Sequence, residues 1–170
     1  MKIEIRRARA EDAREYALCH IACWQSAYRG IIPDAHLDNM SNEIEARVAG
    51  AARAIEGMTD CSFFYAALED RMIGRLIFGK SRDEDMPDAG EIQALYLLGE
   101  YWDMGFGAQM MSYAIDALKN MGHREIILWV LDENKRARRF YEKFNFVFDG
   151  TKKEIEVGRT LLELRYALKL

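Results

Sequence analysis

The chain has 170 residues, the usual size of one domain, so we expect residues 1–170 to form a single domain. Half of the residues are hydrophobic and 31% are charged, a composition that excludes a mainly disordered chain. The formal net charge is −4, which argues against a dedicated nucleic-acid-binding protein, because such proteins usually present a basic surface.

The cysteines and the hydrophobic runs indicate the compartment. Cys19, Cys23 and Cys61 are too few for a disulfide scaffold, so a reducing environment is the simpler interpretation. Residues 1–7 alternate charged and apolar side chains, unlike the apolar core of a signal peptide. The longest apolar run, Ile126–Leu131, is too short to span a bilayer. We therefore expect a cytoplasmic protein that does not bind membranes.

The first half of the chain predicts one strand, two helices and a hairpin. The first helix begins with Glu11 and Asp12, which suit the positive end of a helix dipole, and Gly30 and Pro33 interrupt it. Two β-rich runs on either side of a short charged turn favour a hairpin. The predicted elements are a strand at 3–8, a helix at 10–28, a helix from about 35 or 41 to 54, and strands at 62–68 and 72–78.

The second half predicts strands and helices in alternation. Apolar residues recur at helical spacing after Gly105, and Gly122 ends that helix. The last residues alternate apolar and polar side chains, which is typical of a half-buried strand. We expect a loop at 81–90, strands at 91–97, 126–131, 146–148 and 162–170, and helices at 105–121 and 135–144.

The order of these elements favours an α/β fold in which a mixed sheet carries helices on both faces. The strand–helix–strand unit from Glu91 to Leu131 requires a right-handed crossover between two parallel strands. The hairpins elsewhere add antiparallel pairs to the same sheet.

A pair of glycines marks the strongest candidate binding site. Gly105 and Gly107 open a predicted helix after a strand, where amides without intrahelical partners meet a backbone that a phosphate can approach closely. This predicts a phosphorylated cofactor; a turn or packing role for the glycines is the alternative. The dinucleotide-binding fingerprint is excluded, because Met110 stands where its third glycine would be.

A second phosphate-binding pattern is present by spacing alone. Gly74, Gly79, Lys80 and Ser81 match the spacing of a phosphate-binding loop. The residues between the two glycines are β-rich and apolar, and no helix is predicted after Ser81. The sequence therefore disfavours this interpretation.

The glycine pair lies in a segment that resembles the GNAT superfamily of N-acetyltransferases. Residues 102–108, WDMGFGA, are similar to the superfamily's acetyl-CoA motif, Arg/Gln-x-x-Gly-x-Gly/Ala, which follows its fourth strand. Trp102 stands where the motif has arginine or glutamine.

Two further segments resemble the same superfamily. Residues 134–146, NKRARRFYEKFNF, are similar to its Asn-x-x-Ala-x-x-Phe-Tyr-x-x-x-Gly-Phe segment. Asn145 replaces the glycine, and we expect a left-handed backbone there because asparagine tolerates that conformation well. Residues 24–34 resemble a common opening in small bacterial members, so the resemblance covers nearly the whole chain.

The resemblance implies a sheet that splays at its centre and transfer of an acetyl group from acetyl-CoA to a primary amine, by direct attack in a ternary complex and with no metal. It implies that a strand backbone holds the pantetheine arm and that amides of the glycine segment hold the pyrophosphate. The cofactor-binding residues implied are Leu95, Tyr96, Leu97, Met104, Gly105, Phe106, Gly107, Ala108, Asn134, Ala137 and Arg138.

Tyr141 and Glu91 are the candidate catalytic residues. The resemblance implies that Tyr141 protonates the departing thiolate, and a phenol with an ordinary pKa of about 10 is a plausible donor to a thiolate whose thiol has a pKa of about 8.5. Glu91 stands where histone-type members carry the base that deprotonates the acceptor ammonium. The alternatives are a core aromatic for Tyr141, and for Glu91 a capping or solvent-facing carboxylate, with ordered water as the base.

The acceptor site is marked less clearly. Trp24 and Tyr28 lie one helical turn apart and are candidate acceptor-binding residues, with core packing as the alternative. Residues 81–103 carry an excess of acidic side chains, which would attract a cationic amine or simply form a solvated loop. Residues 19–23, CHIAC, suggest a metal site, but no second Cys/His pair follows nearby, so buried cysteines are favoured.

The expected partner is a small molecule or a peptide with a primary amine, and its identity stays open. A homodimer is compatible with the resemblance, but the sequence does not indicate one. The alternative from another functional class is a non-catalytic domain of the same fold that binds acyl-CoA or docks a partner, because a fold does not determine a function.

Overall fold

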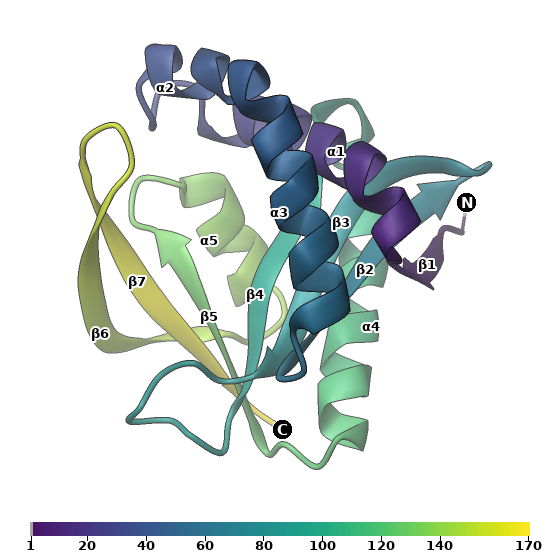
Figure 1. Ribbon diagram of the computed structural model, residues 1–170. Coiled ribbons are helices and arrows are strands. Elements are labelled where there is room, and N and C mark those ends of the chain that lie inside the picture. The colour runs from purple at the N-terminus through teal and green to yellow at the C-terminus, as the bar shows by residue number, and fades with distance from the viewer. Residues whose placement is uncertain (1) are drawn as a thin grey trace.

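The computed structural model describes residues 2–170, which contain a seven-stranded sheet in the order β1-β2-β3-β4-β5-β7-β6 (Figure 1). Neighbouring strands pair antiparallel except β4 and β5, which pair parallel. The predicted mixed sheet is confirmed. The strands are β1 (Glu4–Arg7), β2 (Cys61–Leu68), β3 (Arg71–Lys80), β4 (Gly90–Leu97), β5 (Glu125–Leu131), β6 (Val147–Glu156) and β7 (Thr160–Lys169).

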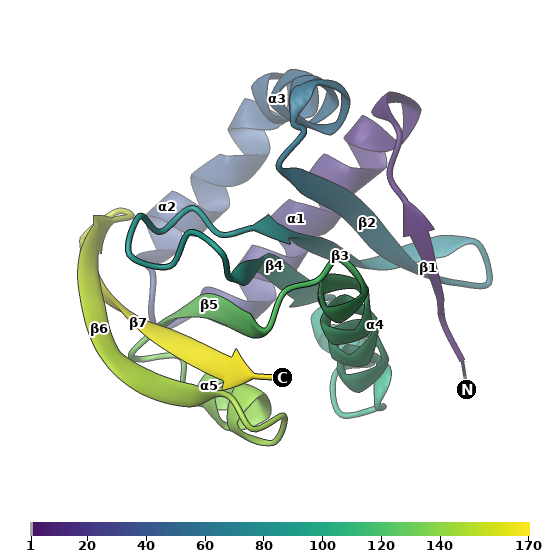
Figure 2. The same ribbon diagram turned by 90° about the horizontal axis from the view of Figure 1, so that it is seen from below.

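Helices cover both faces of the sheet, as predicted. α1, α2 and α3 lie on one face, whereas α4 and α5 lie on the other (Figure 2). The helices are α1 (Ala13–Tyr28), α2 (Asp34–Asn39), α3 (Ile44–Gly57), α4 (Phe106–Asn120) and α5 (Lys135–Glu142). Within residues 2–170, the helices are too short or too polar to cross a membrane.

The spacing of apolar residues in α4 explains how the core forms. Phe106, Met110, Ala114 and Leu118 repeat every four residues, so they share one helix face, and each is at most 1% exposed. They pack with buried residues of the central strands in one cluster. Burying a large apolar side chain contributes roughly 1.5–3 kcal/mol, so this stripe fixes α4 firmly against the sheet.

The sheet opens at its centre, as the resemblance implies. β4 and β5 pair at two positions, residues 90–91 with residues 126–127, and then diverge. We call the opening between the two strands the seam. The register of β4 against β3 also shifts after Ile77, which indicates a bulge in the middle of β4. From residue 92 to residue 97, the edge of β4 that faces β5 therefore presents backbone groups that an extended ligand can pair with.

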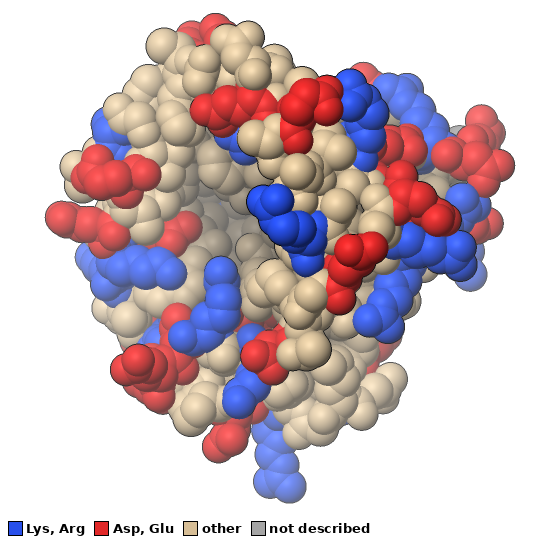
Figure 3. Space-filling model, viewed as in Figure 1, with Lys and Arg blue, Asp and Glu red and all other residues tan. Residues whose placement is uncertain are grey.

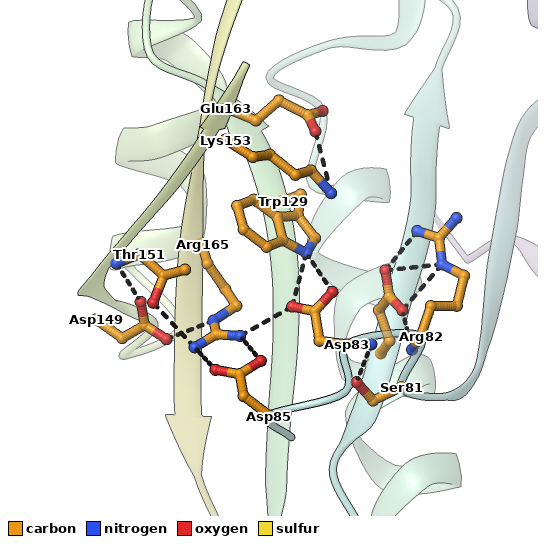
Figure 4. Close-up of polar contacts among 11 residues, drawn as sticks. Ser81, Arg82, Asp83, Asp85, Trp129, Asp149, Thr151, Lys153, Glu163 and Arg165 are labelled. Carbon is orange, nitrogen blue, oxygen red and sulfur yellow. Dashed lines mark hydrogen bonds and ion pairs between the residues drawn. The ribbon is translucent and has the colours of Figure 1, made fainter. Parts of the chain in front are cut away.

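A buried arginine joins the two halves of the sheet across this opening (Figure 4). Arg165 on β7 is 5% exposed and donates to Asp83 at 2.9 Å and to Asp85 at 2.7 Å, both in the loop between β3 and β4. It also donates to Asp149 at 2.6 Å and to Thr151 at 2.9 Å, both on β6. We call these five residues the Arg165 clamp. They connect the β1–β4 half to the β5–β7–β6 half.

Trp129 on β5 extends the clamp toward the seam (Figure 4). Its indole Nε1 donates to Asp83 at 3.1 Å, and the Lys153 ammonium lies 3.8 Å from its ring centroid. A cation over an indole face is attracted by the ring quadrupole. The loop is thus held against β5 as well as against β6 and β7.

One strand is longer than predicted. The sequence predicts a strand at 146–148, but β6 continues to Glu156, so the predicted length is wrong. β6 is an edge strand with mostly exposed side chains, and it therefore lacks the apolar–polar alternation that predicts a strand. Gly150, with φ of +96°, lies at the register shift between Phe148 and Lys152, and in the sequence it has the composition of a turn.

Candidate active site

The N-terminus of α4 follows directly from the open end of β4. Gly105 precedes the helix with φ of +80°, a left-handed conformation that glycine adopts without strain. The first intrahelical hydrogen bond runs from Gln109 N–H to the Gly105 carbonyl, so the amides of residues 106–108 precede it and point outward. Such a helix start can hold an anionic group through its amides and its dipole.

Trp102 brings an arginine to this segment. Its indole Nε1 donates to the Leu97 carbonyl at 2.8 Å, which fixes the ring at the end of β4. The Arg136 guanidinium of α5 lies 4.2 Å from the Trp102 ring centroid and pairs with Asp103 at 3.0 Å. A cation therefore stands beside the glycine segment, although position 102 itself does not supply one.

The start and the end of α5 have the local geometry that their residues favour. Asn134 caps the helix, since its Oδ1 accepts a hydrogen bond from the Ala137 amide at 3.1 Å. This leaves the Asn134 side-chain NH₂ as a donor for a ligand. Asn145, three residues after the helix, has φ of +64°, so the left-handed backbone predicted there is confirmed.

Arg138 has structural partners. It donates to the Asp132 carboxylate at 2.6 Å and to the Tyr166 hydroxyl at 3.1 Å. Arg136 is the arginine of α5 that lies against the glycine segment. Cofactor binding by Arg138 stays a prediction.

Three tyrosines meet beside the open seam. Tyr28 at the end of α1 and Tyr96 on β4 share a hydrogen bond between their hydroxyl oxygens at 3.1 Å. Tyr141 on α5 lies near both of them, and Glu163 on β7 lies near Tyr28 and Tyr96. Burial is the main cause that raises the pKa of all three phenols. Each is therefore protonated at neutral pH and can donate a hydrogen bond.

One face of α1 continues this group of rings. Tyr16, His20, Trp24 and Tyr28 follow one another at four-residue spacing, which aligns them along the helix. The Trp24 ring centroid lies 5.1 Å from those of both His20 and Tyr28, and 6.3 Å from that of Tyr96. Burial lowers the pKa of His20 to about 3, so its imidazole is neutral at physiological pH. Trp24 and Tyr28, the predicted acceptor-binding pair, thus lie beside the seam.

The surface is hollowed on this side of the sheet. Figure 3 shows a hollow between α3 and the β6–β7 hairpin, with mostly uncharged residues on its floor and charged residues around its rim. α4 and α5 lie on the opposite face (Figure 2). The hollow is therefore on the face that carries α1–α3, whereas the glycine segment leads into α4 on the other face.

Comparison with known proteins agrees with this geometry. Residues 15–146 match the model of the acetyltransferase (GNAT) family, which is most of the chain. The chain belongs to this family.

Relatives cover nearly the whole GNAT chain. The uncharacterized N-acetyltransferase YuaI of Bacillus subtilis (strain 168) is 26% identical over 167 residues, 92% of each chain. The probable N-acetyltransferase Rv2775 of Mycobacterium tuberculosis is 29% identical over 148 residues, 87% of this chain and 82% of the relative. The crystal structure of PaiA N-acetyltransferase from Thermoplasma acidophilum in complex with coenzyme A has the same fold, with a TM-score of 0.77 and 22% identity over 100% of both chains.

Glu91 lies where the GNAT seam begins to open. Its side chain is 1% exposed, and it takes part in one of the two residue pairs that join β4 to β5. Its carboxylate accepts hydrogen bonds from the Arg82 backbone amide at 2.9 Å and from Arg82 Nε at 3.0 Å. The capping alternative describes these contacts well, and the catalytic role of Glu91 stays a prediction.

The acidic run at 81–103 is largely neutralised by arginines. Each of its paired carboxylates has a guanidinium within 3.0 Å. The pairs are Asp83 and Asp85 with Arg165, Glu91 with Arg82, Glu100 with Arg71, and Asp103 with Arg136. The run is therefore a set of ion pairs more than an open anionic surface.

Two other patterns in the sequence have structural explanations. Gly74 and Gly79 lie inside β3, and a Cβ at Gly79 would stand 2.1 Å from the Asp60 carbonyl oxygen, so close strand packing explains that glycine. Cys19 and Cys23 are buried with their sulfurs 3.9 Å apart. Within residues 2–170, no group of three or more His, Cys, Asp or Glu side chains could hold a metal ion.

The sequence analysis did not single out two charged residues near the GNAT seam, Arg75 one strand away on β3 and Glu163 on β7. Arg75 interrupts an otherwise apolar stretch of β3, and a charge inside a buried strand is a signal that could have identified it. Glu163 stands opposite Leu131 in the β5–β7 pair. Its place in the alternating pattern of β7 does not predict that it lies near the tyrosines. Only the pairing of strands brings it near the tyrosines.

Proposed function

We propose that the protein transfers an acetyl group from acetyl-CoA to a primary amine in a ternary complex. The open seam between β4 and β5 carries this proposal. It offers an unpaired backbone edge along β4, a helix N-terminus at the end of that strand, and buried hydroxyl groups beside it. An extended ligand with phosphates at one end and a reactive group along its length suits this arrangement. Coenzyme A is bound in the T. acidophilum structure of the same fold.

The cofactor-binding residues follow from these elements. The backbone of residues 95–97 would pair with the amides of the pantetheine arm, and the amides of residues 104–108 would hold the pyrophosphate. Arg136, held by Trp102 and Asp103, would supply the positive charge that the motif's arginine supplies elsewhere. Asn134 would donate its side-chain amide to the pantetheine arm.

Tyr141 is the proposed general acid. In the reaction, the neutral amine attacks the thioester carbonyl, the C–S bond breaks, the nitrogen loses a proton as the amide forms, and the thiolate that leaves takes a proton. Burial keeps the Tyr141 phenol protonated, because it raises the phenol's pKa above the ordinary value. The hydroxyl is therefore protonated when the thiolate develops, and it can donate a hydrogen bond and then its proton to the leaving sulfur.

The acceptor must lose a proton before it attacks, because an alkylammonium has no free electron pair. Glu91 is the candidate base from sequence, and both of its oxygens are engaged by Arg82. Glu163 is a second carboxylate of the seam, next to Tyr28 and Tyr96, and it meets Lys153 at 3.5 Å. An ordered water between the amine and either carboxylate would carry the proton.

Tyr141→Phe tests the proposal. With acetyl-CoA and a panel of primary amines, we expect thiol release from the wild-type protein, and kcat about 100-fold lower in the variant. This is the lower end of the range for general acid catalysis, because a thiolate leaves readily even without help. Calorimetric titration should give the same acetyl-CoA affinity for both proteins, since the phenol oxygen acts on the leaving group.

Tyr113→Phe is the matched control, because Tyr113 is a half-exposed tyrosine of α4 that packs edge-on against Phe64. It should keep the wild-type kcat. A Tyr141→Phe variant that keeps full turnover would remove the general-acid role. A wild-type protein that binds acetyl-CoA but releases no thiol with any amine would instead support the acyl-CoA-binding alternative.

A further inference from the structure

The buried polar atoms that lack hydrogen-bond partners gather in one region. Within residues 2–170 they are the Tyr16 hydroxyl, Trp24 Nε1, Arg47 Nε and Arg75 Nε. All four groups can donate a hydrogen bond, and two of them carry positive charge. Tyr16 lies against Arg75 and Trp24 lies against Tyr96, but neither contact forms a well-aligned hydrogen bond, so a bound group that accepts from these donors would be stabilised.

Ring contacts join three of these four side chains and His20 into two pairs. The His20 ring packs edge-on against Trp24, and the Arg75 guanidinium carbon lies 4.4 Å from the Tyr16 ring centroid. After burial itself, Arg75 and Arg47 are what lower the pKa of His20, so both cations lie near that imidazole. The region therefore lies between α1, α3 and β3, on the face of the sheet that carries the hollow of Figure 3.

Arg75 stands out among the cations of the protein. Of the at least partly buried lysines and arginines in residues 2–170, it is the one without a carboxylate within 4.0 Å. Arg47 pairs with Glu43 at 2.8 Å. Glu15, a carboxylate on α1, accepts a hydrogen bond from the Met72 amide at 3.3 Å and does not pair with Arg75. The half-buried Arg75 therefore lacks a carboxylate partner from the described part of the chain, and an anionic ligand could supply one.

This charge lies one strand away from the proposed reaction centre. Arg75 on β3 is the register partner of Tyr96 on β4, and the Tyr96 hydroxyl is bound to that of Tyr28 beside the seam. The Trp24 ring lies between His20 and Tyr28 along α1. A small molecule could thus reach from Arg75 to the tyrosines with two different functional groups.

We propose that the acceptor carries a carboxylate in addition to its primary amine, and that Arg75 binds this carboxylate. This inference rests on the proposed acetyltransferase function. A carboxylate is planar and accepts two parallel hydrogen bonds from a guanidinium, and Trp24 Nε1 and the Tyr16 hydroxyl lie nearby as additional donors. Amino acids and related amino carboxylates have the required pair of groups. Polyamines are disfavoured, because a second cation near Arg75 and Arg47 would be repelled.

The test compares acceptors that differ in the carboxylate alone. Purified full-length protein with saturating acetyl-CoA is assayed for thiol release with amino acids and with their carboxamides, including glycine, alanine, methionine, glutamate and lysine. We expect kcat/KM for at least one acid to exceed that of its amide by 10-fold or more. In Arg75→Gln the ratio for that pair should fall below about 3, and Arg75→Lys should keep part of it.

Arg71→Gln is the matched control, because Arg71 starts the same strand but is exposed and pairs with Glu100. It should keep the wild-type ratio. Equal kcat/KM for acid and amide in every pair, or a preference for amides or diamines, would overturn the inference while leaving the acetyltransferase function intact. A ratio that survives Arg75→Gln would also overturn it.

A binding measurement covers the case in which no acceptor reacts. The protein saturated with CoA is titrated by calorimetry with the N-acetylated acids and with their amides. Tighter binding of an acid, lost in Arg75→Gln, would support the carboxylate site even if the proposed reaction had failed. Equal binding of acid and amide, or no binding of any pair, would overturn the inference.

Discussion

Two arginines in different halves of the sheet have opposite surroundings. Arg165 on β7 is matched by three carboxylates and the Thr151 hydroxyl. Arg75 on β3 lies over the Tyr16 ring with its Nε unpartnered. Both side chains are at least partly buried, yet the chain supplies carboxylates for Arg165 and none within 4.0 Å for Arg75 in the residues that the structure describes.

The difference separates a structural charge from a functional one. A buried ion pair contributes little when complete, but the loss of Arg165 leaves the largely shielded Asp83 and Asp149 and the more exposed Asp85 without their partner. Arg75 is half-buried with a shielded Nε, and a charge shielded from water without a counter-charge is costly to the free protein. The Arg165 clamp therefore ties the two halves of the sheet together, whereas Arg75 is the arginine for which we propose a ligand.

Replacing Arg165 should have the largest effect. Arg165→Met leaves Asp83, Asp85 and Asp149 without their guanidinium, and we expect the free energy of unfolding to fall by about 3 kcal/mol. Urea denaturation at pH 7 measures this change. Arg71→Met, which removes an exposed ion pair, should stay within about 0.5 kcal/mol of wild type. A similar loss in both variants would mean that the clamp is an ordinary surface feature.

The clamp should also weaken in acid. The hydrogen bond from Arg165 lowers the pKa of Asp85. Burial would raise the pKa of Asp149, but the hydrogen bonds from Thr151 and Arg165 outweigh burial, so the pKa of Asp149 is also lowered. Such groups stabilise the fold above their unfolded-state pKa of about 3.9, and this contribution is lost as pH falls through the lower folded-state values. The stability difference between wild type and Arg165→Met should thus be constant from pH 7 to 5 and shrink below pH 4. A difference that persists at pH 3 would contradict this account.

Replacing Arg75 should have the smallest effect on stability. Arg75→Met loses a cation–π contact worth roughly 0.5–1 kcal/mol but also removes an unpaired buried donor and its charge. We expect the free energy of unfolding to change by less than about 1 kcal/mol in either direction, again by urea denaturation. A loss near 3 kcal/mol would show that Arg75 is as structural as Arg165 and would remove the contrast between them.

The elements with strong local signals were predictable. The apolar stripe of α4, the glycine pair before it, and the segment around Tyr141 identify themselves by spacing. The full length of β6 was not predictable in this way, because an exposed edge strand needs no apolar face. The resemblance to a family supplied the splay of the sheet, which no periodicity in β4 or β5 predicts.

The sequence by itself determined the fold class, the glycine segment that begins α4 and the left-handed turn at Asn145, because these depend on the periodicity and backbone freedom of nearby residues. Tertiary structure alone decided the partners of each charge. Arg165 meets Asp83 from 82 positions away in the chain, and Arg136 reaches Asp103 across 33 positions. Such contacts arise from strand order and helix placement, so a carboxylate-rich loop becomes a clamp and an arginine in an apolar strand becomes a candidate binding residue.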